Sequence, residues 1–263
     1  GVTLTLQAGV SVQVKSNYTL TVQGSLQATG TAASPIQLVS GPATPAAGNW
    51  TGLYFTGTGG GSFTQVQIRH ATYGLRLTGT GSVSLTNSTV ETCSQAAAWV
   101  DNGVFTATGS TLRNDAGNYA LYIEGGADGV TVTGNSRLEV SRNYQTAVYL
   151  SQVNPALVSV TNSQLLATGT NSTAVQTFYY YQTSPSYEGL PVPFTNNWWG
   201  TSDPVAISAV ISDIADGSAR APLIDFTPFL DGPSGNPVPG TFVWGPLLAN
   251  TTWSAANNPY LLV

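Results

Sequence analysis

The sequence predicts an all-β protein folded as a parallel β-helix, a solenoid of stacked turns, with one short capping helix and a C-terminal extension strand. Apolar and polar residues alternate with a period of two over most of the chain, which is typical of half-buried strands. From residue 73 a longer unit repeats, with starts 22 to 27 residues apart. A period of this size that holds several strands indicates a solenoid. Near residue 178 the repeat ends, and a short amphipathic helical pattern follows.

The N-terminal part reads as a series of short strands separated by glycine or asparagine. These residue types are expected at corners where the backbone takes a positive φ. The expected strands lie within residues 2–14, 18–30, 52–57 and 63–71. Because side chains alternate between the two faces of a strand, one face of each should be buried in a common core.

The repeating unit consists of an apolar strand, a Gly- or Asn-containing corner, a second strand and a third short strand. The units start at Tyr73, Ala97, Tyr119, Thr146 and Thr173. In a parallel β-helix, equivalent residues of successive turns lie about 4.8 Å apart. Equivalent inward residues should therefore form an interior ladder, made of Leu85, Phe105 or Ala107, Val132 and Val160. A β-sandwich has a similar strand spacing and is the alternative fold, but the larger period favours the solenoid.

The expected helix covers residues 204–214. Its apolar residues fall at i, i+3, i+4 and i+7 and so share one face; they are Ile207, Val210, Ile211 and Ile214. Asp203 is positioned as the N-cap, and Pro204 occupies the first helical position. A helix placed after the last regular turn would shield the end of a solenoid from water and from strand pairing.

Residues 194–230 carry a more specific pattern. They contain an Asn-Trp-Trp-Gly corner at 197–200, the expected helix, and the strand Leu-Ile-Asp-Phe-Thr-Pro-Phe-Leu at 223–230. This arrangement resembles the closing segment of bacterial right-handed parallel β-helix repeat surface proteins, and the N-terminal strands resemble the opening turns of that family. The resemblance implies a right-handed parallel β-helix over residues 1–230 in an exported setting. It also favours a structural cap made by Trp198, Trp199, Asp203 and Pro204. Because the family includes adhesin-like modules and polysaccharide-active enzymes, function does not follow from the fold.

The residues after the β-helix read as a linker followed by a strand segment. Residues 231–240 are mostly Pro, Gly, Ser and Asn, a composition that predicts a linker. Residues 241–263 are hydrophobic again and too short to fold alone. In the family that the chain resembles, a strand of the Pro-Tyr-hydrophobic type opens the first turn, just ahead of a strand like the one at residues 2–6. Here that order is inverted.

Three arrangements reconcile this inverted order. Residues 241–263 donate a strand to the first turn of another copy, or they continue covalently into a following copy, or they fold back on their own first turn. The first two are head-to-tail and generate an open filament. The predicted interface residues are Trp253, Pro259, Tyr260, Leu261, Leu262 and Val263 on one side, with Val2, Leu4 and Leu6 on the other.

Composition narrows the range of functions. Only 7% of the residues are charged, against roughly 25% in an average soluble protein. The net charge is −5 and the seven basic residues are scattered, so a nucleic-acid partner is not expected. No apolar run is long enough to span a membrane. A single cysteine excludes an intrachain disulfide framework. The composition favours an exported surface protein.

No constellation of catalytic residues stands out. Asp101, Glu124 and Tyr149 occupy similar positions in their units, so Asp101 and Glu124 are expected to be neighbours, but turn or surface roles suit them better than a carboxylate-pair active site. His70, the one histidine, reads as a hydrogen-bonding residue at a strand end, and Cys93 as a small buried residue. We expect no catalytic residue, no metal site and no cofactor.

Aromatic residues gather near the end of the repeat. Three successive tyrosines in a strand must point at least one ring outward, so Tyr179, Tyr180 and Tyr181 are candidate glycan-binding residues. Exposed rings of this kind offer a sugar-stacking platform or a protein interface. Sugar stacking and a protein interface are also the alternative roles for Trp198 and Trp199, although the capping role is preferred.

These observations predict an extracellular structural module that is not an enzyme. Its partner is another copy of itself, joined head-to-tail into a filament or surface layer through the C-terminal segment. A carbohydrate-binding surface adhesin is the alternative, and a polysaccharide lyase or hydrolase is a further one that the scarcity of titratable groups disfavours.

Overall fold

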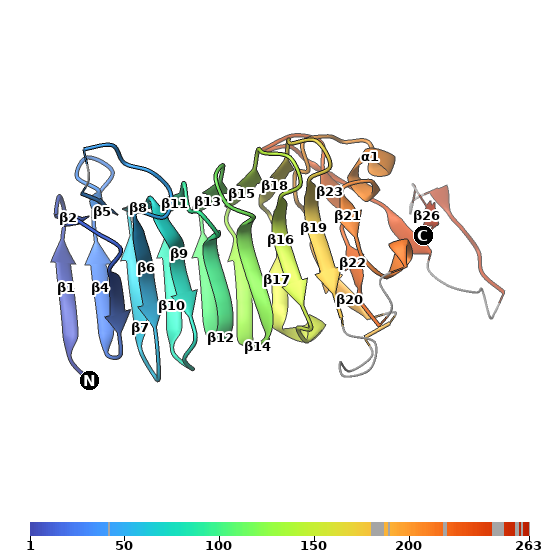
Figure 1. Ribbon diagram of the computed structural model, residues 1–263. Helices are drawn as coiled ribbons and strands as arrows, with labels where there is room; N and C mark the ends of the chain where they lie inside the picture. The colour runs from blue at the N-terminus through green and yellow to red at the C-terminus, as the bar shows by residue number, and fades with distance from the viewer. Residues whose placement is uncertain are drawn as a thin grey trace.

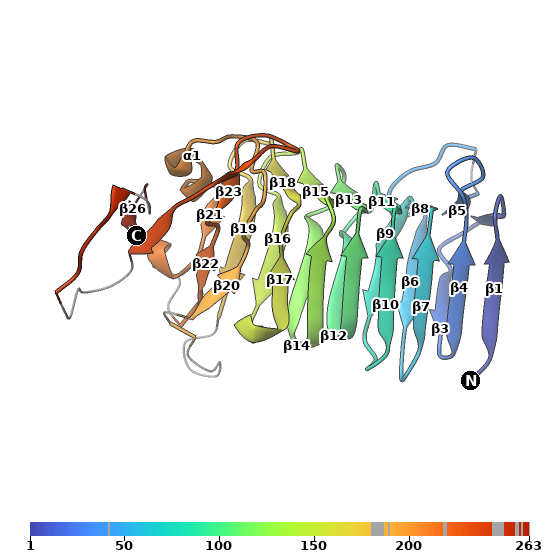
Figure 2. The same ribbon diagram turned by 180° about the vertical axis from the view of Figure 1, so that it is seen from behind.

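In a computed structural model the chain forms a right-handed parallel β-helix of about seven turns with almost no helix (Figure 1). The structure describes residues 1–41, 43–179, 187–188, 190–217, 220–243, 250–255, 258 and 260–262. The turns stack in chain order from the N-terminus. The last residues lie beyond the final turn, at the end of the solenoid opposite the N-terminus in both views (Figures 1 and 2).

The larger sheet has 13 strands, all paired in parallel with their neighbours. Its main path runs through β1 (Thr3–Gln7), β4 (Ser25–Thr29), β7 (Gly60–Thr64), β10 (Ser82–Thr86), β12 (Ala96–Thr108), β14 (Tyr119–Thr133), β16 (Thr146–Ser151), β19 (Thr173–Phe178) and β21 (Ile211–Ser212). Off this path lie β3 (Thr19–Val22), β6 (Trp50–Phe55), β9 (Ala71–Leu77) and β17 (Val158–Val160). The parallel pairing excludes the β-sandwich alternative.

The second sheet forms another side of the solenoid and has seven parallel strands. These are β2 (Ser11–Val14), β5 (Ile36–Ser40), β8 (Val66–Arg69), β11 (Thr89–Glu91), β13 (Thr111–Asn114), β15 (Arg137–Val140) and β18 (Gln164–Ala167). Three two-stranded sheets follow at the C-terminal end: β20 (Pro191–Pro193) with β22 (Leu223–Asp225), β23 (Phe229–Leu230) with β24 (Pro237–Val238), and β25 (Thr241–Val243) with β26 (Tyr260–Leu262).

The predicted interior ladder is confirmed, with Ala107 as its middle member. Leu85 pairs with Ala107, Ala107 with Val132, and Val132 with Val160. All four side chains are buried. The unit starts are also in register, except that Ala96 rather than Ala97 is equivalent to Tyr73 and Tyr119. The hydrophobic core is therefore a set of columns that run along the solenoid axis.

The corner between the first two strands of a unit is shallower than expected. In two turns these strands merge into one long strand, β12 or β14, with register shifts between Val100 and Asn102 and between Gly103 and Val104. Gly103 has a φ of 75°, and a Cβ there would lie 2.4 Å from the Gly81 carbonyl oxygen. The backbones pass too closely at this point for a side chain to fit. The two predicted strands thus share one continuous sheet.

A column of buried polar side chains follows the next corner. Three serines of this column accept a hydrogen bond from a backbone N–H of the preceding turn, in the pairs Val66 to Ser88, Ser88 to Ser110 and Ser110 to Ser136, at 3.0 to 3.1 Å. Asn197 ends the column. Its Oδ1 accepts from the Ser163 N–H at 2.8 Å, and its Nδ2 donates to the carbonyls of Val160 and Phe194. The asparagine of the Asn-Trp-Trp-Gly corner is therefore an internal polar cap.

The predicted helix is much shorter than expected, and the prediction of 204–214 is wrong in its length. Helix α1 spans Pro204–Ser208 only. Asp203 is its N-cap and accepts from the Val205 N–H, with Pro204 at the first position, as predicted. The chain then returns to β21, which pairs with β19, before the 3₁₀ helix η2 (Ile214–Asp216). Strand pairing with the last turn overrides the helical pattern, since the β-branched residues here suit a strand.

The C-terminal region holds more structure than a linker. Within residues 231–240, β24 pairs antiparallel with β23, and Asp231 Oδ1 accepts from the Asn236 N–H at 2.7 Å. Val238 packs against the core. A second 3₁₀ helix, η1 (Pro155–Leu157), lies in a loop before β17. Among the described residues no helix is long and apolar enough to cross a membrane.

Candidate functional site

The outer face of the larger sheet carries a row of large side chains in register on five successive turns. Tyr54, Arg76, Trp99, Tyr122 and Tyr149 pair with one another from strand to strand. Both sequence neighbours of each are buried, so alternation along the strand directs these five side chains outward. With four spacings of about 4.8 Å, the row extends over roughly 19 Å of the solenoid axis.

Two more tyrosines join this row and complete what we call the aromatic strip: Tyr54, Tyr73, Trp99, Tyr119, Tyr122 and Tyr149. Trp99 stacks on Tyr122 with ring centroids 3.8 Å apart, and Tyr122 on Tyr149 at 5.0 Å. Tyr73 and Tyr119 meet Trp99 edge-on, at interplanar angles of 89° and 83°. All six rings are half-buried. Within the stack, the facing sides of Trp99, Tyr122 and Tyr149 cover each other.

Arg76 is held within the strip. Its guanidinium carbon lies 5.0 to 5.7 Å from the ring centroids of Tyr54, Tyr73 and Trp99, which is cation–π range. Its Nε donates to Asp101 Oδ2 at 2.9 Å, and the Trp99 indole N–H donates to Asp101 Oδ1 at 2.7 Å. Both carboxylate oxygens of Asp101 are thereby engaged, and the charge of Arg76 is balanced.

Glu124 provides the other carboxylate at the strip. The Ser151 hydroxyl donates to Glu124 Oε1 at 2.9 Å. Burial raises the pKa of Tyr122, and its hydrogen bond with Glu124 acts in the same direction while that with Ser151 opposes it. Burial likewise raises the pKa of Tyr73 and of Tyr119. These phenols stay neutral across the physiological range, so they remain hydrogen-bond donors.

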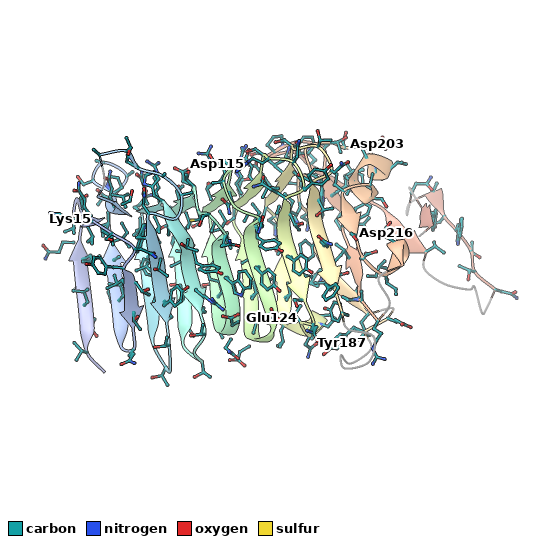
Figure 3. The ribbon with its side chains drawn as sticks, in the orientation of Figure 1. Lys15, Asp115, Glu124, Tyr187, Asp203 and Asp216 are labelled. Carbon is teal, nitrogen blue, oxygen red and sulfur yellow. The ribbon has the colours of Figure 1, made fainter. Side chains whose placement is uncertain are left out.

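Asp101 and Glu124 lie on neighbouring turns, as expected from their positions in the repeat, with the β12 register shift beside them. Tyr149 is not their equivalent, because it pairs with Tyr122, and Ser151 pairs with Glu124. Figure 3 shows Glu124 on the face of the larger sheet, well apart from Asp115, Asp203 and Asp216. Within the described ranges, no group of three or more His, Cys, Asp and Glu residues is placed to hold a metal ion.

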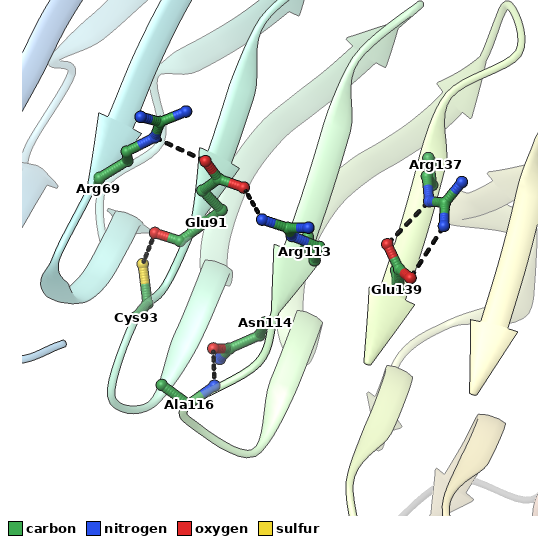
Figure 4. Close-up of polar contacts among 8 residues, drawn as sticks. All are labelled: Arg69, Glu91, Cys93, Arg113, Asn114, Ala116, Arg137 and Glu139. Atoms are coloured by element: carbon green, nitrogen blue, oxygen red, sulfur yellow. Dashed lines mark hydrogen bonds and ion pairs between the residues drawn. The ribbon is translucent and has the colours of Figure 1, made fainter. Parts of the chain in front are cut away.

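The second sheet has an ion ladder of its own. Glu91 bridges Arg69 at 2.6 Å and Arg113 at 2.5 Å across three turns (Figure 4). On the next turn, Arg137 makes a two-bonded contact with Glu139, at 2.8 and 2.9 Å. Like the strip, the Arg69–Glu91–Arg113 part of this ladder joins neighbouring turns, whereas Arg137 and Glu139 pair within β15. Its arrangement suits reinforcement of the solenoid.

Neither candidate nucleophile or base is placed for chemistry. Cys93 is fully buried, its thiol donates to the Glu91 carbonyl at 3.6 Å, and burial raises its pKa to about 12. This matches the predicted packing role. His70 sits at a strand end with a φ of 67° and a buried Nδ1. Burial lowers its pKa below 6.5, Arg69 adds to this, and Glu91 and Asp115 oppose it.

We expect the stability of the protein to fall slightly as the pH drops from 7.5 to 5. The folded state disfavours protonated His70, so the unfolded state binds more protons once the pH falls below 6.5. The loss should be below about 1 kcal/mol because the imidazole is partly solvated. His70→Asn, which tolerates the positive φ, should reduce this pH dependence in urea unfolding curves. An unchanged difference between pH 7.5 and pH 5 would contradict the assignment.

The two tryptophans of the Asn-Trp-Trp-Gly corner lie near the end of the solenoid. Trp199 is buried, and its ring packs edge-on against Phe226 at 6.0 Å and tilted against Phe194 at 6.4 Å. Trp198 is half-buried, and its backbone bridges to Gln164 of β18. These contacts place both tryptophans in the closure of the last turn.

Tyr179, the first of the three candidate glycan-binding tyrosines, does not lie at the surface. Tyr179 is 7% exposed, and its hydroxyl donates to the Val153 carbonyl at 2.7 Å. Its ring also meets Tyr187 edge-on at 5.8 Å. The chain turns inward here, so Tyr179 offers no open ring to a sugar. Tyr180 and Tyr181 lie outside the described residues.

The two predicted interface surfaces lie at opposite ends of the solenoid. Val2, just before β1, is 84% exposed, and on β1 Leu4 is 51% exposed, whereas Leu6 packs partly against the core. In the C-terminal segment Trp253 is 43% exposed and stacks on Tyr260 at 4.6 Å. The Tyr260 hydroxyl accepts from the Ser254 N–H at 2.6 Å and donates to its carbonyl.

Other predicted interface residues are described only in part. The backbone of Leu261 and Leu262 belongs to β26, which pairs with β25, while Pro259 and Val263 lie outside the described residues. Within the described part of the chain, β26 has no pairing with β1. The arrangement in which the tail folds back onto its own first turn is therefore not the one seen.

Sequence reasoning missed the aromatic strip and the role of Asn197. A signal for the strip was present, because Trp99, Tyr122 and Tyr149 each lie three residues after the first residue of their unit, once Ala96 is taken as a start. For Asn197 the signal was the serine that follows each Asn or Gly corner. Both are visible only after the turns are placed in register.

Comparison with known proteins supports this architecture. Residues 47–184 match the family model described as the right handed beta helix region, which is slightly more than half of the chain. The chain belongs to this right-handed β-helix family. No match was found among curated proteins or among solved structures. Membership in the β-helix family establishes the fold, and the activity has to be argued from the surface.

Proposed function

We propose that this β-helix is an extracellular structural module and not an enzyme. The observation that carries the proposal is that charged side chains on its two sheet faces are engaged in ion pairs, most of them between turns. Arg76 is matched by Asp101, and Glu91 by Arg69 and Arg113, across neighbouring turns, whereas Arg137 and Glu139 pair within β15. A catalytic site needs a group held near a reacting atom with its chemistry free. The ion pairs of Arg76 and of Glu91 instead tie successive turns together.

The module joins other copies head-to-tail through residues 241–263, by strand donation or by covalent continuation into a following copy. Two observations support this. Ile207 of α1 and Trp199 with its aromatic neighbours are buried at the C-terminal end of the solenoid, so the stack is not extended there by simple stacking. The β25–β26 pair is parallel and separate from the two large sheets. A parallel strand outside the solenoid is the kind of element that pairs with another copy.

Two further functions compete with this proposal. The adhesin reading, in which the protein binds surface glycans, loses support from Tyr179, which is buried. The lyase or hydrolase reading requires free carboxylates, whereas Asp101 and Glu124 are both hydrogen-bonded. The proposed module needs no metal, cofactor or nucleic acid and does not insert into a membrane.

Deletion of residues 241–263 tests the assembly. We expect the full chain to form end-to-end assemblies visible by electron microscopy at high concentration, and the shortened chain to remain monomeric with an unchanged circular dichroism spectrum. As a matched control, Tyr144→Ala alters an exposed corner tyrosine outside both ends and should leave the assemblies intact. Assemblies that persist without residues 241–263 would rule out joining through this segment, as would a full chain that stays monomeric even when two copies are expressed in tandem.

A further inference from the structure

A second outward face of the solenoid carries serine and threonine side chains in two ranks. It lies beyond the register shift at Gly103, on β7, β10, the second halves of β12 and β14, and β17 (Figures 1 and 2), so it is separate from the aromatic strip. Paired residues of successive turns form the ranks, which are Ser62, Ser84, Thr106, Thr131 and Ser159 in one and Thr64, Thr86, Thr108 and Thr133 in the other. We call these residues the hydroxyl array.

The hydroxyl array is a regular two-dimensional grid. The residue between the two ranks is buried on each turn, as at Phe63, Leu85, Ala107 and Val132, so alternation along the strands directs the array side chains outward. Neighbouring turns are about 4.8 Å apart, and the two ranks are roughly 6.6 Å apart because they are separated by two residues of a strand. Threonine is restricted at χ1 by its branched Cβ, so the hydroxyl and methyl positions repeat from turn to turn.

The hydroxyl groups of the array are not used to hold the fold together. Within the described part of the chain, none of them donates or accepts a hydrogen bond to another protein group. The backbone carbonyls of Thr86, Thr108 and Thr133 accept from the buried serine column instead. The array thus presents its donors and acceptors to a partner outside the chain.

The composition of this face narrows the kind of partner. On the strand segments that form it, all of them described, the outward residues are serine, threonine and glycine, with Val104 as the one apolar side chain. A polyanion finds no cation here, and a protein partner finds none of the aromatic or arginine anchors that dominate binding energy at interfaces. A small molecule is bound in a concave site, whereas short side chains on a single sheet give no enclosing wall.

A periodic surface of this kind is matched by a periodic partner. Water molecules in an ice crystal repeat at fixed intervals of a few ångströms in two directions of a crystal face, as the array does. Ice and liquid water are chemically identical, so only groups held in a fixed geometry can distinguish them. Hydroxyls donate and accept as water does, and contacts to water that is already ordered avoid the entropy cost of immobilising it. Many weak contacts made together by one rigid sheet then add up.

We propose that the hydroxyl array is an ice-binding surface. Its hydroxyls take the hydrogen-bonding positions of water molecules at the crystal surface, and the threonine methyl groups occupy the spaces between them. The adsorbed protein then blocks growth of the crystal at that surface. The array lies on the side of the solenoid, so ice binding does not depend on the joining of copies through residues 241–263.

The proposal is tested with the full chain by partition into slowly grown ice and by the interval between the melting and freezing temperatures of a single ice crystal. We expect the full chain to be enriched in the ice and to open a measurable interval. Thr108→Tyr places a large ring within the array and should lower the ice-bound fraction at least tenfold. Thr111→Tyr, the same change at an outward position of β13 in the other sheet, should leave it unchanged.

A second variant covers the case in which Thr108→Tyr disturbs the fold. Thr131 is exposed, so the long side chain of Thr131→Lys extends into solvent, and this variant should keep its circular dichroism spectrum while losing at least tenfold in ice binding. The proposal is overturned if the full chain is excluded from ice, if the folded array variants bind ice as the full chain does, or if Thr111→Tyr loses as much as they do.

Two further measurements separate ice from other flat partners. If Thr108→Tyr abolishes binding to crystalline cellulose, or lowers the sedimentation mass of the protein, while the full chain shows no ice binding, the face belongs to a polysaccharide crystal or to a second copy. Either outcome overturns the proposal.

Discussion

Replacing Asn197 with alanine is expected to destabilise the protein by about 3 to 5 kcal/mol. The Asn197 side chain is fully buried and makes three hydrogen bonds to the backbone of Val160, Ser163 and Phe194. Its removal leaves one N–H and two carbonyl groups unpaired in the interior, and each unpaired buried group costs about 1 to 3 kcal/mol. Urea unfolding at pH 7 measures the change.

An exposed asparagine supplies the control for this substitution. Asn118 lies at an exposed corner, and its side chain makes one long hydrogen bond, 3.4 Å, to Gln95. Asn118→Ala should change the free energy of unfolding by less than about 0.5 kcal/mol. A loss of stability at Asn197 no larger than that at Asn118 would show that the polar cap is not needed to close the serine column.

Gly52→Ala is expected to cost about 3 kcal/mol or more, because the substitution forces two adjacent turns apart. A Cβ at this position would lie 1.7 Å from the carbonyl oxygen of Tyr73 on the next turn, and the φ of Gly52 is 123°, a conformation that alanine rarely adopts. The obstacle is backbone, so side-chain rearrangement cannot relieve it. The melting temperature and the urea midpoint should both fall.

Gly129 provides the matched control within the same sheet. A Cβ there would meet only Val104 side-chain atoms at 3.9 to 4.0 Å, an ordinary contact distance. Gly129→Ala should be neutral or slightly stabilising, since alanine restricts the unfolded chain. If Gly52→Ala unfolds at the same urea concentration as Gly129→Ala, the close approach of β6 and β9 is not a constraint on the sequence.

Much of the solenoid was predictable because each turn repeats the same physical demands. The alternation of buried and exposed residues, the Asn and Gly corners, and the interior ladder through Leu85, Ala107 and Val132 all follow from local pattern. Asn87, Asn162 and Asn196 do take a positive φ at their corners. Sequence alone fails where one turn decides the conformation of another. Ile211 lies on a helical face by spacing, yet it pairs with Val175 on β19.

The candidate site was harder to predict than the fold. Successive residues of its row, Tyr54, Arg76, Trp99, Tyr122 and Tyr149, are 22 to 27 residues apart, and no two of the stacked rings are neighbours in sequence. A register error of one residue at Ala97 was enough to hide the row. Asp101 and Glu124 lie two residues after Trp99 and Tyr122, so the residue that continues their column on the next turn is Ser151 and not Tyr149. The three tyrosines at 179–181 are conspicuous because they are adjacent in sequence, whereas the residues of the aromatic strip come together only in the folded chain.

The parallel register also determines how the module responds to mechanical load. Hydrogen bonds between turns point along the solenoid axis, so tension applied along that axis loads the turns in series and the weakest interface separates first. The ion ladder of Arg69, Glu91 and Arg113 and the stack of Trp99, Tyr122 and Tyr149 cross successive interfaces in the middle of the solenoid. Axial rupture should therefore start outside this reinforced middle, at an interface between turns that neither the ion ladder nor the aromatic stack crosses.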